Sequence, residues 1–318
     1  MAAIPVVIDT DPGIDDALAI MLALASPELD VRALTSVGGN TGLANTTENA
    51  LRLLHLCGRD DIPVGAGADV PLVRRDSKAD EATHGADGFG GVQLEPAPHG
   101  ADPRGAVQVI ADVVTGSPSP VTLIALGPLT NVAALIAAYP EVAARLERIV
   151  LMGGGARVLG NMTPAAEFNI WYDPEAAARV FAAGIPITMV GLDVTHQALT
   201  APGDWDRLRA PGTGAVARAV LGMVDYYTEY HRATVGTDST AQHDSLAVAA
   251  VIRPDLLTTV PAHVDVEYVG TLTRGMTVVD LDHVGDQPPT ADVGIAVDAD
   301  AFNTLLVDRV VELDRSVR

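Results

Sequence analysis

Short runs of β-branched and other apolar residues alternate with longer amphipathic stretches over the first two thirds of the chain. A short apolar run is typical of a buried strand, and the amphipathic stretch that follows it is typical of a helix. Repeated strand–helix units predict a mostly parallel sheet with helices on both faces. We predict strands over Ile4–Ile8, Val31–Val37, Ile62–Val64, Val121–Ala125, Arg148–Met152 and Ile187–Val190, and helices over Asp15–Ala25, Thr41–Leu56, Pro103–Val114, Leu129–Ala138 and Pro174–Ala183.

The pattern changes beyond Thr195, where long helices are followed by strands of alternating polarity that are expected to pair antiparallel. We predict helices over Gly214–Ala233, His243–Ile252 and Ala301–Leu313, and strands over Val264–Tyr268, Met276–Asp280 and Val293–Val297. No linker or repeat divides the sequence, so residues 1–318 are expected to form a single domain. The fold class is α/β: an open, mostly parallel, Rossmann-like sheet with helices on both faces and a small C-terminal antiparallel addition.

Two long segments, Ala68–Ala101 and Gly153–Asn169, show no periodicity. Long loops inside a compact α/β domain are usually functional. Ligands of open α/β sheets bind outside the carboxyl ends of the strands. Polar residues that directly follow predicted strands are therefore the first candidates for a site.

The charge balance excludes several classes of partner. The chain has 41 acidic and 20 basic side chains, for a formal net charge of −21. Nucleic acid and anionic membranes are bound through Lys and Arg, so we expect neither partner. A hydrophobic content of 48% with 19% charged residues argues against a disordered acidic chain. With one cysteine, Cys57, and no basic N-terminal leader pattern, the sequence predicts a cytoplasmic protein.

Four carboxylates cluster at the end of the first predicted strand, at Asp9, Asp11, Asp15 and Asp16. Capping of the next helix accounts for Asp15 or Asp16 but leaves Asp9 and Asp11 unexplained. Carboxylates held this close repel one another. A hard divalent cation such as Ca²⁺, which takes oxygen ligands, explains the whole cluster better.

A phosphatase of the haloacid dehalogenase type is the rival interpretation, because these Mg²⁺ enzymes also have a strand that ends in Asp-x-Asp. In those enzymes a Thr or Val follows two residues after the second Asp. Here Pro12-Gly13 and then two more acids follow Asp11, which weighs against that class.

Other strand ends carry polar groups as well. Asn40 follows the second strand, where it could line a site or cap the next helix. The carbonyls of residues 126–131, beginning at Leu126, point out of the sheet and could ligate a cation. Met152 precedes three glycines, Gly153–Gly155, which do not fit the G-x-G-x-x-G pattern, so a nicotinamide cofactor is not expected.

The second unpatterned loop contains Asn161, Glu167 and Asn169. Amides and carboxylates pair well with sugar hydroxyls, so these residues suit a polyhydroxyl ligand. The alternative is that Glu167 or Asn169 simply braces the loop.

Two histidines complete the candidates. His243-Asp244 opens an apolar helix, and taken alone this pair reads as a surface imidazole and a helix cap. His84 lies in the first unpatterned loop, where a lone histidine usually faces solvent.

Taken together, these motifs resemble the nucleoside hydrolases, which cleave ribonucleosides to a free base and ribose. The strongest match is D-T-D-P-G-I-D-D at Asp9–Asp16. The segments at Ala125–Asn131 and Gly160–Asn169 and the pair His243-Asp244 follow in the expected order, so the resemblance spans nearly the whole chain.

The resemblance implies a role for each candidate. Asp11 would be the general base for a metal-bound water, and His243 would help to protonate the leaving base. His84 matches the loop histidine of the subgroup that has histidine rather than tryptophan at this place. Ca²⁺ would be held by Asp11, Asp16, Asp244 and the main-chain carbonyl of Leu126. The substrate-binding set would be Asp15, Asn40, His84, Met152, Asn161, Glu167 and Asn169.

The base pocket is less defined by the sequence. Tyr226 and Tyr230 are four residues apart on one predicted helix, with Tyr227 and His231 beside them, and could stack on the base. Packing of the helix explains them equally well. Purine and pyrimidine bases both fit this description. Ser245 stands where the family usually has proline after His-Asp, which is expected to cost rigidity rather than a ligand.

The chemistry implied by the resemblance agrees with the residues. An N-ribosidic bond breaks through an oxocarbenium-like transition state, whose positive charge suits an acidic cluster. We therefore predict a Ca²⁺-dependent ribonucleoside hydrolase of nucleoside catabolism and salvage, forming a homodimer or homotetramer as the family commonly does. The alternatives are the Mg²⁺ phosphatase and a non-catalytic calcium- and ribose-binding protein.

Overall fold

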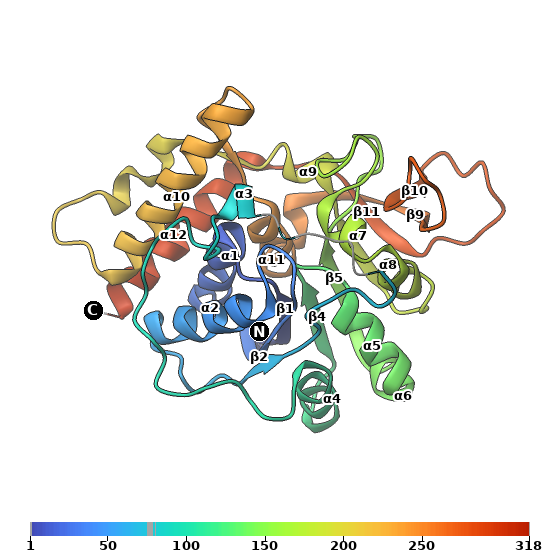
Figure 1. The fold of residues 1–318 in the computed structure, drawn as a ribbon, viewed down its shortest axis with the longest axis horizontal. Coiled ribbons are helices and arrows are strands. Elements are labelled where there is room, and N and C mark those ends of the chain that lie inside the picture. The colour runs from blue at the N-terminus through green and yellow to red at the C-terminus, as the bar shows by residue number, and fades with distance from the viewer. Residues whose placement is uncertain (1, 75–78, 80, 318) are drawn as a thin grey trace.

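The computed structural model describes residues 2–74, 79 and 81–317. Within these residues nine strands form one sheet in the order β10-β9-β11-β6-β5-β4-β1-β2-β3 (Figure 1). The strands of this sheet are β1 (Ile4–Thr10), β2 (Leu29–Ser36), β3 (Val64–Ala66), β4 (Val121–Ala125), β5 (Leu146–Met152), β6 (Ile187–Val190), β9 (Leu257–Glu267), β10 (Met276–Asp280) and β11 (Ala291–Val297).

The predicted fold class is confirmed. Each pair of neighbours from β3 to β6 is parallel, and only β9 and β10 run antiparallel to their neighbours. The C-terminal addition continues the same sheet, because β11 pairs in parallel with β6 and antiparallel with β9. Strand β9 begins at Leu257 rather than at the predicted Val264, since the first half of the strand is largely exposed and lacks a clear apolar alternation.

Helices cover both faces of the sheet (Figure 1). One apolar core forms under α1, α2, α10, α11 and α12, and the other forms under α4, α5 and α8. The helices are α1 (Ile14–Ala25), α2 (Leu43–Leu56), α3 (Glu81–His84), α4 (Ala106–Gly116), α5 (Thr130–Ala138), α6 (Pro140–Ala143), α7 (Phe168–Tyr172), α8 (Pro174–Phe181), α9 (Leu192–Thr195), α10 (Ala215–Thr234), α11 (His243–Ile252) and α12 (Ala299–Ser316). In the described part of the chain no helix is both long and apolar enough to cross a membrane.

Helices α1 and α11 lie against each other and are buried almost all round. A helix that is apolar on every side must be enclosed by other elements. Both helices carry acidic residues in the first turn, Asp15 and Asp16 in α1 and Asp244 in α11. The packing of the two helices brings these first turns together.

The differences from the sequence prediction are small and lie at short elements. Strand β3 is shifted by two residues from the predicted Ile62–Val64, because its pairing with β2 sets its bounds. The sequence prediction missed α3, α6, α7, α9, a 3₁₀ helix at Pro202–Leu208 and the two-stranded ribbon of β7 (Leu199–Thr200) and β8 (Thr240–Ala241). Of the predicted loop Ala68–Ala101, residues 75–78 and 80 lie outside the described residues.

Candidate active site

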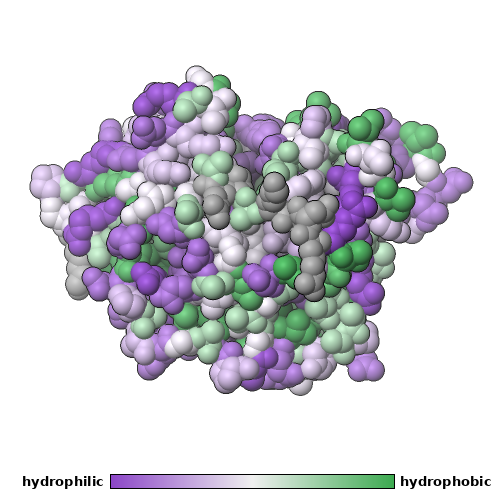
Figure 2. Space-filling view, viewed as in Figure 1, coloured by the Kyte–Doolittle hydropathy of each residue, from purple (hydrophilic) through white to green (hydrophobic). Residues whose placement is uncertain are grey.

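The candidate site lies where the strand order reverses between β1 and β4, at the carboxyl ends of the parallel strands. A cavity of about 640 Å³ opens there. Figure 2 shows a depression along the upper edge of the molecule, between the end of α10 and the loop of residues 153–167. The described residues that line the cavity include all but two of the predicted site residues: Asp11, Asp15, Asn40, His84, Leu126, Met152, Asn161, Glu167, Asn169, Tyr230, His243 and Asp244.

Four buried carboxylates cluster at the cavity, and three of them line it. Asp11 follows β1, Asp15 and Asp16 open α1, and Asp244 opens α11. None of the four is more than 6% exposed. Asp15, Asp16 and Asp244 each have one carboxylate oxygen that lies within 4.8 Å of such an oxygen on the other two residues. Among the described residues, the group able to hold a metal ion thus contains Asp15, which the resemblance assigns to ribose, and does not contain Asp11, which the resemblance assigns to the ion.

The backbone fixes these carboxylates in place. Asp16 accepts hydrogen bonds from the Thr10 hydroxyl and from the Gly13 amide at 3.0 Å. Asn40 donates a hydrogen bond from its backbone N–H to Asp11 Oδ2 at 2.7 Å. Its side-chain Nδ2 donates to Asp16 Oδ2 at 3.0 Å. Asn40 is therefore a brace between the first two strands as well as a lining residue.

Two glycines explain how Asp11 fits. A Cβ atom on Gly39 or Gly127 would collide with the carboxylate of Asp11. Both positions follow strand ends, so the absence of a side chain lets the backbone of two loops approach the acid closely. Asp9 lies deeper, where it accepts hydrogen bonds from Thr35 and Asn131 and does not line the cavity.

The negative charge of this cluster is not offset by a basic side chain among the described lining residues, which favours binding of a cation. Burial raises the pKa of Asp11 and of Asp244 well above the usual range, and neighbouring carboxylates add to both shifts. Burial raises the pKa of Asp15 to about 6, against the opposing effect of His84. None of the described residues that line the cavity is Lys or Arg. Asp15 Oδ1 is buried without a hydrogen-bond partner in the described structure.

The loop of residues 153–167 and α7 form one side of the cavity. Asn169 donates from Nδ2 to the Leu126 carbonyl at 2.6 Å and to the Met152 carbonyl at 3.1 Å. Asn161 accepts a hydrogen bond from the Phe168 amide and keeps an exposed side chain.

Glu167 is the N-cap of α7 and accepts hydrogen bonds from the backbone amides of Gly154, Asn169 and Ile170. The carboxylate of Glu167 therefore braces the loop, which was the alternative role considered from the sequence. The residue also lines the cavity. Burial raises the pKa of Glu167 to about 6, and the same backbone hydrogen bonds oppose the shift.

Aromatic rings and imidazoles form the opposite wall. His84 Nδ1 accepts a hydrogen bond from the Ile14 amide, and the His84 ring stacks on Tyr227 with centroids 6.0 Å apart. Tyr227 also meets His231 edge-on, at 4.6 Å between centroids. His84 is therefore held by the protein rather than facing solvent, and is only 5% exposed.

Tyr226, which we expected at the site, lies outside the cavity and packs over Gly90. The residues of α10 that line the cavity are Tyr227, Tyr230, His231 and Thr234. This spacing of three, four and seven residues is one face of a helix. The sequence showed the aromatic cluster, but the rotation of α10 against its neighbours chose Tyr227 over Tyr226.

His243 is partly buried at the start of α11, and its Nδ1 lies 2.9 Å from Thr195 Oγ1. Burial lowers the pKa of His243 to about 3, and the nearby imidazoles of His196, His231 and His84 act in the same direction. His196 lines the cavity edge-on to His243, with centroids 5.9 Å apart. Sequence reasoning missed His196 and Thr195, although both follow the predicted sixth strand, where polar residues deserved inspection.

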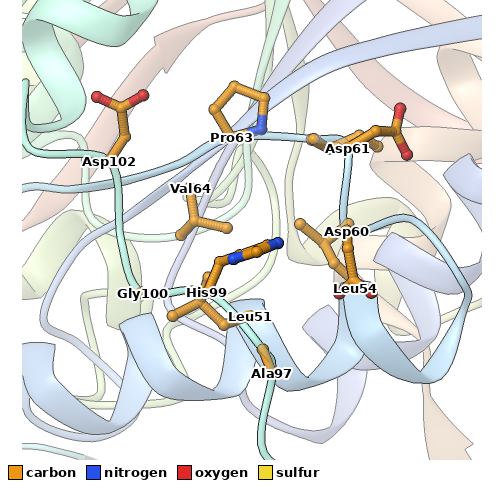
Figure 3. A pocket seen from close by; sticks show the side chains of 11 residues that line it. Leu51, Leu54, Asp60, Asp61, Pro63, Val64, Ala97, His99, Gly100 and Asp102 are labelled. Atoms are coloured by element: carbon orange, nitrogen blue, oxygen red, sulfur yellow. The ribbon is translucent and has the colours of Figure 1, made fainter.

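A second, smaller hollow of about 160 Å³, which we call the outer pocket, lies beside the end of α2 (Figure 3). It is lined by Leu51, Leu54, Asp60, Asp61, Ile62, Pro63, Val64, Ala97, His99, Gly100 and Asp102. Figure 3 shows the carboxylates of Asp61 and Asp102 turned away from the ring of His99. Each acid pairs with a base outside the pocket: Asp60 with His55, Asp61 with Arg59 and Asp102 with Arg104.

Comparison with known proteins identifies the class of enzyme. Residues 6–304 match the family model of the inosine-uridine preferring nucleoside hydrolases. The pyrimidine-specific ribonucleoside hydrolase RihA of Citrobacter koseri is 47% identical over 309 residues, which cover 97% of this chain and 98% of that protein. RihA of Escherichia coli O1:K1 is 46% identical with the same coverage.

Solved structures agree with the sequence comparison. The purine-preferring ribonucleoside hydrolase from Gardnerella vaginalis has a TM-score of 0.93 at 32% identity, covering 98% of this chain and 99% of that one. The plant nucleoside hydrolase PpNRh1 has a TM-score of 0.91 at 36% identity, covering 96% and 98%. The fold and site thus define an N-ribosyl hydrolase. The chain belongs to the inosine-uridine preferring nucleoside hydrolase family and hydrolyses ribonucleosides.

Proposed function

We propose that this enzyme hydrolyses ribonucleosides in a Ca²⁺-dependent reaction, with Asp11 as general base and His243 serving the leaving base. The observation that carries the proposal is the cluster of four buried carboxylates without a Lys or Arg at the carboxyl ends of β1 and β4. Neither rival interpretation from the sequence is favoured, since the family match covers nearly the whole chain.

The donor set fits a hard cation. Asp11, Asp16, Asp244 and the Leu126 carbonyl would hold it, and Asp15, whose Oδ1 has no hydrogen-bond partner in the described structure, offers an oxygen close to those of Asp16 and Asp244. These ligands are all oxygen, which favours calcium or magnesium over softer metals. When bound, the ion offsets the repulsion between the acids, helps to orient the ribose hydroxyls and makes water easier to deprotonate.

The residues of the chain account for the proton transfers. The bond between C1′ of ribose and the base nitrogen breaks, and its electron pair goes to the base. The oxygen of a water molecule bonds to C1′ while one proton of that water passes to Asp11. A raised pKa makes Asp11 a better acceptor than an ordinary carboxylate. The departing base takes up a proton that His243 passes on from solvent, and Asp11 releases to solvent the proton that it took from the water, so that nucleoside and water give ribose and neutral base.

The carboxylates also act on the transition state. Positive charge develops on the ribosyl group as the bond breaks, and negative groups already held in place stabilise it without reorganisation. Asn169 and Asn161 present amides to the sugar from the opposite side, and Asn40 holds Asp11 and Asp16 in register. Positioning of this kind supplies a large part of the rate enhancement.

The wall of the cavity receives the base. Tyr227, Tyr230 and His231 offer flat rings for stacking and polar atoms for hydrogen bonds. We assign pyrimidine ribonucleosides as the preferred substrates, because the relatives that are 46–47% identical are named pyrimidine-specific, whereas the purine-preferring neighbour is 32% identical.

A reducing-sugar assay over uridine, cytidine, inosine, adenosine and guanosine tests the proposal. We expect faster ribose release from uridine and cytidine, strong loss of activity on chelation and recovery with Ca²⁺. Release of phosphate from a phosphomonoester without ribose release would contradict it. Tight binding of nucleosides without ribose release would instead support a binding protein.

We also propose that the enzyme is a homodimer or homotetramer of the cytoplasm. The oligomer is supported by the family resemblance and by exposed apolar side chains in the loops on either side of β10, including Val269, Leu272 and Val284. The single cysteine is compatible with a reducing compartment. Light scattering after size-exclusion chromatography measures the oligomeric state, and fractionation of the native cell tests the location.

A further inference from the structure

We propose that Thr195 is a positioning residue that holds the imidazole of His243 so that its Nε2 atom faces the leaving base. This inference rests on the proposed function, in which His243 serves the leaving base. It assigns a role to a side chain that does not itself line the cavity.

The contact is direct and partly buried. Thr195 Oγ1 lies 2.9 Å from His243 Nδ1, and Thr195 has no exposed surface. Thr195 ends α9, and its amide bonds to the Gly191 carbonyl directly after β6. The hydroxyl is therefore held at the end of a sheet strand, which is a rigid support for the imidazole.

The hydrogen bond decides which ring nitrogen is available. With Nδ1 occupied by Thr195, the remaining nitrogen, Nε2, is the one left for a ligand. A hydroxyl that donates into Nδ1 leaves the ring hydrogen of a neutral imidazole on Nε2. That hydrogen can be donated in a hydrogen bond to a nitrogen or carbonyl of the departing base, on the path by which a proton from solvent reaches it.

Other groups near this contact are engaged elsewhere. Asp193, two residues before Thr195, accepts hydrogen bonds from the amides of Ala156 and Arg157 at 2.6 and 2.8 Å. His196 meets His243 edge-on, with no hydrogen bond recorded between the two rings. Within the described residues, the Thr195 hydroxyl is the hydrogen-bond partner found for His243 Nδ1.

The backbones on both sides of the contact are tied together independently of the hydroxyl. Strands β7 and β8 pair Leu199 with Ala241 and Thr200 with Thr240. The Gln242 amide donates to the Ala198 carbonyl at 2.9 Å. Removing only the hydroxyl should therefore leave the chain path intact and release only the imidazole.

The test compares Thr195→Val with Thr195→Ser on two substrates. Uridine has a base that must leave with a proton, whereas p-nitrophenyl β-D-ribofuranoside has a leaving group that departs as a stable anion. We expect Thr195→Val to lower kcat on uridine about 10- to 100-fold with little change in KM, as for other partners that orient a histidine. The same variant should keep activity on the aryl riboside within about twofold.

Thr195→Ser keeps the hydroxyl and should restore most of the uridine activity. The matched control is Thr122→Val, which makes the same change at a buried threonine at the start of β4 and should leave both activities unchanged. An equal loss on both substrates in Thr195→Val would show a general structural role and overturn the inference. Unchanged activity on uridine would overturn it as well.

Failure of the proposed function would look different. If the wild type released ribose from neither substrate, the hydrolase proposal itself would fail. If the wild type were active but His243→Ala lost the same factor on both substrates, His243 would not serve the leaving group, and the role of Thr195 would fall with it. A selective loss on uridine in both His243→Ala and Thr195→Val supports the inference.

Discussion

Two hollows in this molecule are lined by several aspartates and at least one histidine, yet they differ in every property that matters for chemistry. Asp11, Asp15 and Asp244, which line the active-site cavity, are buried, have raised pKa values and face no Lys or Arg among the described lining residues. In the outer pocket each aspartate pairs with a basic side chain, and the pKa of Asp102 is lowered to about 2 by the Arg104 beside it.

The difference shows that an acidic cluster becomes a site through burial without pairing. An exposed ion pair contributes little to stability, and its acid does not need a bound cation because the basic partner already offsets its charge. Buried carboxylates that lack cationic partners destabilise the fold until a ligand offsets their charge. The predictions below test this contrast by making the same change in both hollows.

The largest effect is expected from Asp11→Asn in the cavity. Loss of the general base should lower kcat about 10³-fold or more while the protein stays folded. The same replacement at Asp61 in the outer pocket should leave kcat within about twofold. Initial rates of ribose release, with circular dichroism as a check of folding, measure both. A similar loss in both variants would remove the distinction between the two hollows.

Calcium should stabilise the protein through the cavity alone. A ligand that binds only the folded state at about 100 times its Kd adds about 2.7 kcal/mol to the free energy of unfolding. Thermal unfolding with chelator and then with excess Ca²⁺ should show this as a rise in Tm. Asp244→Asn should abolish the rise, and Asp102→Asn should retain it. Retention of the full rise in Asp244→Asn would place the ion elsewhere.

Without calcium, removing one of the crowded charges should stabilise the fold. Burial raises the pKa of Asp15 from 3.8 to about 6, so its charge begins to destabilise the folded state above pH 3.8, and the cost is complete above about pH 6. Asp15→Asn should therefore raise the free energy of unfolding of chelated protein by about 1–2 kcal/mol at neutral pH.

The control for this variant is Asp60→Asn in the outer pocket, where Asp60 pairs with His55 near the surface. Its free energy of unfolding should change by less than about 0.5 kcal/mol. Urea titration of both variants measures the difference. A destabilised Asp15→Asn protein would mean that the hydrogen bonds of Asp15 outweigh the repulsion.

A separate effect, on the reactivity of a thiol rather than on catalysis or stability, concerns the depth of the outer pocket. Cys57 follows α2 just behind this pocket, is 3% exposed and packs in the same apolar core as Leu54 and Ile62. Burial raises the pKa of its thiol to about 12. Iodoacetamide at pH 8 should therefore alkylate the folded protein about 100-fold more slowly than the unfolded chain, as measured by mass spectrometry. Equal rates would show that the pocket opens into the core.

Much of the fold followed from the hydrophobic pattern. The alternation of apolar runs and amphipathic stretches predicted every strand of the nine-stranded sheet and every long helix of the described chain, with α11 placed to the residue. Short elements such as α7 and α9 escaped, because a single turn of helix has no periodicity to detect and forms only where neighbours hold it.

The site was predicted in outline and altered in detail. Acidic and amide residues after strand ends were expected to converge, and they do. Which tyrosine enters the cavity depended on the rotation of α10, and the capping role of Glu167 depended on where α7 begins. Local sequence spacing encodes neither the choice of tyrosine nor the capping role of Glu167, since both depend on contacts between distant segments.

By itself the sequence determined the class of fold, the acidic motif at Asp9–Asp16 and the resemblance to nucleoside hydrolases, because apolar periodicity and short motifs are local properties of a chain. Only the tertiary structure decided that Asp15, Asp16 and Asp244 share one cluster, that Tyr227 rather than Tyr226 lines the cavity, and that the Thr195 hydroxyl contacts the His243 ring. These outcomes depend on how α1, α10 and α11 pack, and packing angles are set by contacts across the whole domain.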